Sequence, residues 1–179
     1  DDLPEQTVEF RGRGNSTWGM AKKPYRFKMS SKAALCGLPK AKTFVLLANY
    51  IDCTLMRNTI AFWVANYLEM PFSNHGIPVR VFFNGIDKGA YLLTEKIGIG
   101  GGSVDIDEDK GMLFELDSNY DEAYRFHYYG NGHELPVMVK DPDITEINLP
   151  EGYTVDQYFL AWKADFTEMA DAVSAADPD

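Results

Sequence analysis

Residues 11–28 read Arg-Gly-Arg-Gly-Asn-Ser-Thr-Trp-Gly-Met-Ala-Lys-Lys-Pro-Tyr-Arg-Phe-Lys. The pattern predicts a loop rich in glycine, hydroxyl groups and cations between a strand at residues 7–11 and a second strand at residues 25–30. Such a loop offers backbone N–H groups, short side-chain donors and positive charge, which are the features that bind phosphate. A solvated basic hairpin explains the same residues, and both interpretations stay open at this point.

The second of these strands alternates in character. Tyr25, Phe27 and Met29 fall on one face, whereas Arg26 and Lys28 fall on the other, because side chains alternate along a strand. Two cations on one strand face, next to a glycine and serine loop, are the arrangement of a phosphate clamp.

Further blocks follow the loop at regular intervals. The loop contributes Arg-Gly-Asn-Ser-Thr-Trp at residues 13–18 and Lys-Pro-Tyr-Arg-Phe-Lys at 23–28. Residues 46–58 contain Leu-Leu-Ala-Asn-Tyr-Ile-Asp and Leu-Met-Arg-Asn, residues 83–96 contain Phe-Asn-Gly and Gly-Ala-Tyr-Leu-Leu-Thr-Glu-Lys, and residues 113–117 read Leu-Phe-Glu-Leu-Asp. In this order, over about residues 8–145, the blocks resemble the spore coat protein H (CotH) kinase family.

The resemblance implies an atypical protein-kinase-like phosphotransferase that uses ATP and Mg²⁺ and phosphorylates Ser or Thr of an acceptor protein. Many members of the family are secreted or bound to the cell surface, so that location is expected. The implied fold is α+β: a kinase-like small lobe at residues 1–150, mostly antiparallel sheet with one packed helix, and an amphipathic helix at 151–179 that begins a second lobe.

The chain departs from the family in one respect. In the family, acidic Asn-x-Asp and Trp-Asp-Phe-Asp motifs follow the helix that comes after the Glu-Leu-Asp strand, and this chain contains neither motif after its last predicted helix. We therefore expect the catalytic and metal-binding acids beyond Asp179, in an intact parent, and we expect this chain alone to be inactive.

Several residues are candidates for the nucleotide site. Arg13, Asn15 and Ser16 are assigned to a phosphate loop, and Arg26 and Lys28 to neutralisation of phosphate charge. Glu95 is expected to pair with one of these two cations, as in a kinase lysine–glutamate pair, or else to lie near an exposed strand end.

Three more polar positions match family blocks. Arg57, with its neighbour Asn58, lies on a predicted helix and faces the phosphate or holds the loop; an ordinary polar helix face is the alternative. Glu115 and Asp117 project from one strand, where a kinase hinge would meet adenine and ribose. Two exposed strand carboxylates would look the same.

Charge is distributed unevenly along the chain. Residues 1–96 hold 13 Lys/Arg and 8 Asp/Glu, a net charge of +5, whereas residues 97–179 hold 4 and 19, a net of −15. A cationic first half suits a nucleotide, whereas the acidic second half disfavours long nucleic acid or is simply a solubilising surface. No run of about 20 apolar residues exists that would span a membrane.

The remaining motifs favour no metal centre. His75, His127 and His133 are scattered, and Asp105, Asp107 and Asp109 fail the calcium-loop pattern, which favours an acidic turn. Cys36 and Cys53 are two free thiols or one disulfide.

Local patterns predict most of the elements. They indicate a strand at residues 43–50, a helix capped by Asp52 that runs to about residue 68, a hairpin turning at Asn84-Gly85, and strands at 112–117 and 136–140. Residues 120–132 are read as an excursion between strands. The apolar stripe expected to face the core from the first helix comprises Met56, Ile60, Trp63, Val64 and Tyr67. Thr154 and Gln157 form a capping box before the last helix.

Two other function classes compete with the phosphotransferase. One is a non-catalytic cell-surface binding or adhesion module with the same fold. The other is a carbohydrate-binding domain, suggested by aromatic residues that include Tyr124, Tyr128 and Tyr129.

Overall fold

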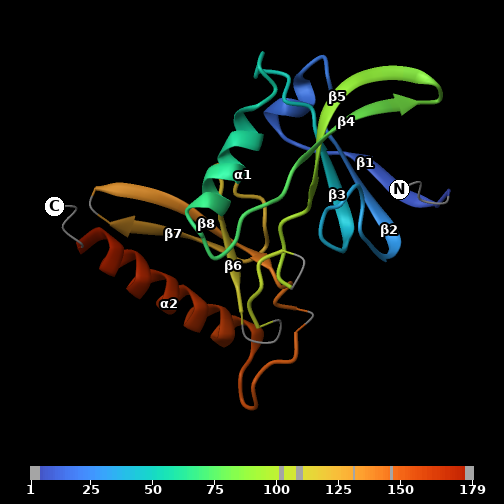
Figure 1. Cartoon of the computed structure of the whole chain (residues 1–179). Helices are drawn as coiled ribbons and strands as arrows, with labels where there is room; N and C mark the ends of the chain where they lie inside the picture. The colour runs from blue at the N-terminus through green and yellow to red at the C-terminus, as the bar shows by residue number, and fades with distance from the viewer. Residues whose placement is uncertain (1–4, 101–102, 108–110, 131, 146, 176–179) are drawn as a thin grey trace. The chain divides into compact units, whose positions relative to one another are not determined.

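The computed structural model of the chain describes residues 5–100, 103–107, 111–130, 132–145 and 147–175 (Figure 1). The chain divides into two compact units, Asp1–Asp105 and Ile106–Asp179. Each unit contains one antiparallel sheet and one α-helix, and the second helix is C-terminal. The expected α+β class with mostly antiparallel sheet is confirmed, whereas the expected domain boundary at residue 150 stays a prediction.

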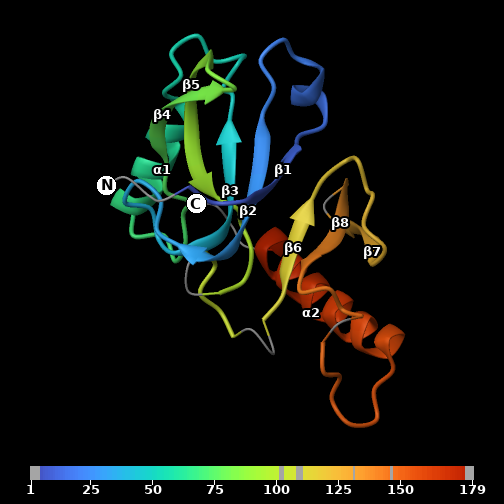
Figure 2. The same ribbon diagram turned by 90° about the vertical axis from the view of Figure 1, so that its right-hand side faces the viewer.

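The first unit is built on a five-stranded sheet with the strand order β1-β2-β3-β5-β4 (Figure 2). All of its strand pairs are antiparallel. The elements are β1 (Val8–Gly12), the 3-10 helix η1 (Ser16–Gly19), β2 (Tyr25–Ala33), β3 (Ala41–Leu47), α1 (Arg57–Tyr67), β4 (Ile77–Phe83) and β5 (Ile86–Glu95).

One face of this sheet carries the core of the first unit. Phe27 pairs with Phe44 across β2 and β3, and their rings stack with centroids 5.7 Å apart. Phe44 is fully buried, and Tyr91 and Leu93 of β5 belong to the same apolar cluster. The alternation seen in β2 is therefore real, and its apolar face supplies the burial that stabilises the sheet.

Positive-φ residues set the ends of two strands. Asn84 and Gly85 have φ values of 50° and 77° and form the expected β4–β5 hairpin turn. Strand β3 ends at Leu47, earlier than expected, and Asn49 two residues later has a φ of 47° that no strand conformation allows.

The side of α1 that faces the sheet is not the side that the sequence predicts. Ile60, Trp63 and Tyr67 are 49%, 64% and 73% exposed, so the predicted apolar stripe does not face a core within the described residues. Phe62 instead approaches the sheet: at Gly76, just before β4, an added Cβ would lie 3.0 Å from both the Phe62 ring and the Leu92 side chain of β5.

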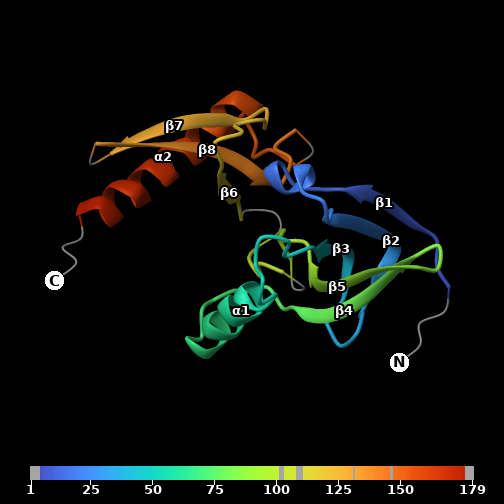
Figure 3. The same ribbon diagram turned by 90° about the horizontal axis from the view of Figure 1, so that it is seen from above.

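The second unit is a three-stranded sheet with one long helix along it. The strand order is β6-β8-β7, and Figure 3 shows α2 running beside β7 and β8. The elements are β6 (Leu113–Leu116), β7 (Arg125–Gly130), β8 (His133–Asp141) and α2 (Val155–Ala175).

Strand β7 was not predicted. It lies within the segment interpreted as an excursion and pairs with β8 in a regular antiparallel register. Phe126 and Tyr128 are buried on one face, while Tyr129 on the other is 70% exposed. Tyr128 donates a hydrogen bond to Asp171 at 2.7 Å, and Tyr124 packs on the ring of Phe159. The three tyrosines considered for carbohydrate binding thus form no shared exposed surface.

Helix α2 packs against the sheet through one apolar side. Its apolar cluster with the sheet includes Phe159, Trp162, Phe166 and Ala170. The capping box is present, since the Gln157 N–H donates to Thr154 Oγ1 at 3.3 Å and the Thr154 N–H donates to Gln157 Oε1 at 3.0 Å.

Two further sequence features have a defined place. Cys36 and Cys53 are exposed, free thiols. Of Asp105, Asp107 and Asp109, the last lies outside the described residues. Neither α1 nor α2 is apolar enough along its length to cross a membrane.

Replacing Phe166 by Ala should destabilise the second unit by about 3–5 kcal/mol, because a buried ring would leave a cavity between α2 and the sheet. Urea unfolding monitored by circular dichroism measures this change. Met169→Ala, on the same helix but 53% exposed, is the control and should have a much smaller effect. Equal effects of the two substitutions would contradict this packing.

Candidate functional site

The loop between β1 and β2 folds back against its own strands. Trp18 donates its backbone N–H to the Asn15 carbonyl at 3.2 Å, which closes the η1 turn. Gly12 lies against the Trp18 ring so closely that an added Cβ would lie 2.2 Å from it. Gly14 has a φ of +87°, a conformation that favours glycine. The glycines of this motif are therefore needed for the shape of the loop itself.

Both lysines of the loop donate a hydrogen bond to a backbone carbonyl, Lys22 to the sheet and Lys23 to the loop itself. Lys22 donates to the Ala90 carbonyl and lies 4.4 Å from the ring centre of Tyr91, and burial lowers the pKa of its amine. Lys23 donates to the Trp18 carbonyl, and its own carbonyl accepts the Tyr91 hydroxyl at 3.0 Å. The Lys22 amine and the Lys23 carbonyl therefore tie the loop to β5, and both lysine amines already have a backbone acceptor.

The turn before α1 is organised by Asp52. Its carboxylate accepts the Thr54 hydroxyl at 2.6 Å and the Arg57 backbone N–H at 2.8 Å, so it satisfies the first N–H of the helix from five residues away. These hydrogen bonds, that from the Thr54 side chain first, lower the Asp52 pKa to about 2. Asn58 donates to Asn49 Oδ1 at 2.8 Å, which ties the helix to the end of β3.

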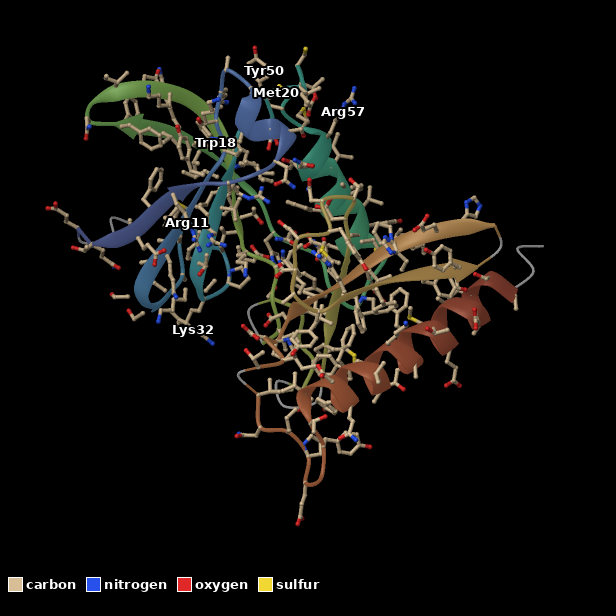
Figure 4. The ribbon with its side chains drawn as sticks, turned by 180° about the vertical axis from the view of Figure 1, so that it is seen from behind. Arg11, Trp18, Met20, Lys32, Tyr50 and Arg57 are labelled. Atoms are coloured by element: carbon tan, nitrogen blue, oxygen red, sulfur yellow. The ribbon has the colours of Figure 1, made fainter. Side chains whose placement is uncertain are left out.

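The loop and the turn enclose a cavity of about 330 Å³. Figure 4 shows Met20, Tyr50 and Arg57 close together at this end of the first unit. Arg13 and Arg57, both predicted site residues, line the cavity, whereas Asn15 and Ser16 lie on the loop outside its lining. The polar lining residues are Arg13, Thr17, Lys22, Asn49, Asp52, Arg57 and Asn58.

Arg26 and Lys28 line a different cavity, of about 200 Å³, on the polar face of the sheet. The register explains this grouping, because Arg11 pairs with Arg26 and Lys28 pairs with Thr43, and directly paired residues share a face. Lys96 joins them where its N–H donates to the Thr43 carbonyl at 3.0 Å and extends the β3–β5 pairing. The sheet-face cavity is lined by Glu9, Arg11, Arg26, Lys28, Thr43 and Lys96.

The cations of the sheet-face cavity form no ion pair in the described part of the chain, although Glu9 pairs in register with Lys28. None of Arg11, Arg26, Lys28 and Lys96 lies in the ion pairs found there, and Glu9 is the one carboxylate of the lining. In the loop cavity, by contrast, Arg57 lies 3.6 Å from the Asp52 carboxylate and Lys22 is held by the backbone. The sheet face is therefore the more strongly anion-attracting of the two sites.

Glu95 does not pair with Arg26 or Lys28, which corrects the kinase-like pairing expected from the sequence. It pairs in register with Phe44 and so lies on the apolar face, opposite the two cations. Its Oε1 accepts the backbone N–H of His75 at 2.8 Å and lies 3.0 Å from the His75 ring nitrogen Nδ1. Its Oε2 is buried and has no partner among the described residues.

Glu115 and Asp117 belong to the second unit. Glu115 and Glu122 both contact Lys140, at 2.7 and 2.8 Å. Although burial lowers the Lys140 pKa, the hydrogen bonds to the two carboxylates raise it well above its usual value. Asp117 accepts the N–H and the side-chain amide of Asn119. Both carboxylates thus have local structural partners, and an adenine or ribose contact stays a prediction.

Sequence reasoning missed Arg11, Thr43 and Lys96 as site residues. A signal for Arg11 was present, because a hairpin that closes through residues 13–24 places it opposite Arg26. No local pattern indicated Thr43 or Lys96, whose positions depend on the pairing of β3 with β5.

A family model described as CotH kinase protein matches residues 8–166 of the chain. No curated protein matches the chain. The matched range contains every element from β1 to β8 and more than half of α2.

The Gly14→Ala substitution should destabilise the first unit by about 1 kcal/mol or more, because a Cβ is strained at a φ of +87°. It would also meet Thr17 Oγ1 at 2.1 Å. Gly19→Ala is the matched control, since nothing lies within 4 Å of the added Cβ, and it should leave stability nearly unchanged. Chemical unfolding of both variants tests the loop conformation, which an unaffected Gly14 variant would contradict.

The turn at Asp52 should weaken in acid. Its pKa is about 2 in the fold against 3.8 in the unfolded chain, so the carboxylate contributes stability above about pH 4 that is lost as the pH falls towards 2. Comparing the free energy of unfolding of the wild type and of Asp52→Asn across this range should show a difference that shrinks in acid. A difference independent of pH would mean that the charge of Asp52 does not matter.

Proposed function

Because the chain belongs to the CotH kinase protein family, we propose that its first unit binds the phosphate groups of ATP in the sheet-face cavity. On this proposal the protein forms part of a phosphotransferase that acts on Ser or Thr hydroxyls of another protein. The secreted or cell-surface location expected from the family resemblance belongs to the same proposal.

The observation that supports the proposal is the group of four cations that form no ion pair in the described part of the chain. Phosphoryl transfer depends mainly on positioning the phosphates and neutralising their charge. Arg11 and Arg26 offer planar guanidinium groups that can bind two phosphate oxygens at once, and Lys28 and Lys96 offer compact charges. Like charges held this close repel one another, and an anion between them would relieve that repulsion.

The loop cavity is the weaker candidate for phosphate. It is larger, but Asp52 offsets part of its positive charge and Lys22 already has backbone and ring partners. We assign to the loop residues Arg13, Asn15 and Ser16 and to Arg57 a supporting role, in which the loop is held in shape above the β1–β2 end of the sheet.

The residues fit phosphate better than they fit a metal ion. Glu9 is the single carboxylate of the sheet-face cavity, and the described part of the chain contains no group of three or more metal-binding side chains. ATP would supply the phosphoryl group, with Mg²⁺ held on its phosphate oxygens. The part of this chain is to hold those phosphates.

Replacing Lys28 by Met should weaken the binding of ATP and Mg²⁺ about ten- to hundredfold, because a hydrogen bond to a charged group contributes about 1.5–3 kcal/mol. Lys28 is exposed on β2, and Met keeps an unbranched stem, so stability should change little. Calorimetric titration of the chain measures the affinity directly.

The matched control is Lys88→Met, which removes the same charge from an exposed position of β5 outside the cavity lining. Its affinity for ATP should stay close to that of the wild type. Unchanged binding in Lys28→Met, together with a loss in Arg57→Met, would move the phosphate site to the loop cavity and overturn the proposal.

A further inference from the structure

A second group of cations lies beside the proposed phosphate cavity. Lys32 at the end of β2, Lys40 and Lys42 around the start of β3, and Lys96 after β5 line a cavity of about 160 Å³. Figure 4 shows Lys32 at the opposite end of the first unit from Met20, Tyr50 and Arg57. Four lysines therefore converge from three segments that are distant in the sequence.

This cavity and the sheet-face cavity share part of their lining. Thr43 and Lys96 line both, so the cations form one surface along the sheet. We call this surface the cationic strip, and it consists of Arg11, Arg26, Lys28, Lys32, Lys40, Lys42 and Lys96.

Hydrogen bonds order the residues after β5 that line the cavity at the lysine end of the strip. Gly98 donates its N–H to Ser103 Oγ at 2.9 Å, Gly100 donates to the Val104 carbonyl at 2.8 Å, and Val104 donates to the Gly98 carbonyl at 3.0 Å. These bonds hold residues 98–100 against Ser103 and Val104, and four of these residues, Gly98, Ile99, Gly100 and Ser103, line the cavity. The lysines thus surround a defined hollow.

The strip is also unusual for a chain of this charge. The protein has 27 Asp and Glu against 17 Lys and Arg, a net charge of −10. Yet no ion pair within the described residues involves any of the seven cations of the strip. Glu9 is the one carboxylate that lines either cavity, so most of the positive charge is available to an anion from outside the chain.

We propose that Lys32, Lys40 and Lys42 bind acidic side chains of the acceptor protein, so that the acceptor class is a Ser or Thr within an acidic segment. The proposal rests on the proposed function: ATP phosphates would occupy Arg11, Arg26, Lys28 and Lys96, and the acceptor must approach the terminal phosphate. The three remaining lysines continue the same surface and would then face the chain that carries the hydroxyl.

A short acidic segment fits better than a long polyanion. The chain has a net charge of −10, which disfavours the binding of a long nucleic acid. A few Asp or Glu side chains need only the lysine end and its 160 Å³ hollow.

The test uses a fluorescein-labelled peptide, Glu-Glu-Glu-Ser-Glu-Glu-Glu, titrated with the whole chain without nucleotide and followed by fluorescence anisotropy. The Glu peptide should bind, and a peptide with Gln in place of every Glu should not. In Lys40→Gln/Lys42→Gln the affinity should fall about tenfold, since two charge contacts contribute roughly 0.7 kcal/mol each. Lys88→Gln, an exposed lysine outside the strip, is the control and should bind the peptide like the wild type.

A second titration separates this inference from the proposed function. Lys40→Gln/Lys42→Gln should bind ATP like the wild type, because neither residue lines the sheet-face cavity. If the wild type binds the peptide through these lysines but does not bind ATP, the proposed function fails while the acidic-segment site stands.

Three results would overturn the inference: equal binding of the Gln peptide, unchanged peptide affinity in the double variant, or tighter binding of a single-stranded oligonucleotide of the same charge through the same lysines. Lys40 and Lys42 are both exposed, and circular dichroism of the double variant should confirm that the fold is kept.

Discussion

The antiparallel register of β1, β2 and β3 is the constraint on which the first unit depends. Phe10, Phe27 and Phe44 are paired in sequence across the three strands, and this row brings the apolar side chains onto one face. Side chains alternate along a strand, so a slip of one residue would move the aromatic residues to the polar face and the cations into the core. The burial of Phe44 thereby also fixes where Arg26 and Lys28 are displayed. The cationic face needs no contacts of its own to be held in place.

That arrangement separates stability from binding. The favourable free energy of the sheet comes from the apolar face, while like charges on the other face oppose folding. Polar groups at the end of β5 are held individually: Glu95, on the apolar side, is fully buried beside His75, and Asn74 donates to Thr94 Oγ1 and to the Glu95 carbonyl. Sites that bind charged ligands commonly carry such a local cost, which the rest of the fold offsets.

Local sequence patterns were sufficient for features that depend on neighbouring residues. The alternation in β2, the turn at Asn84 and Gly85, and the capping box at Thr154 are all of this kind, and all are confirmed. The inward side of α1 was predicted wrongly because apolar residues occur on more than one side of that helix, and the close approach of Phe62 at Gly76 decides between them.

The same distinction holds for the candidate site. Arg26 and Lys28 could be placed on one face from their spacing alone, and the structure agrees. The partner of Glu95 was not predicted, because the contact with His75 depends on the register of β4 and β5, which brings the residues before β4 next to the end of β5. Strand β7 was missed for a similar reason: its alternation becomes clear only when β8 pairs with it.

The two free thiols give this chain a built-in means of spectroscopic labelling. They are its only cysteines, and both are exposed within the first unit. Cys53 follows Asp52, at the rim of the loop cavity, and Cys36 lies in the β2–β3 connection that leads to Lys40. A fluorophore coupled to either thiol would report on one cavity at a time. A pair of them would measure a distance internal to this unit, independent of how the rest of the chain moves.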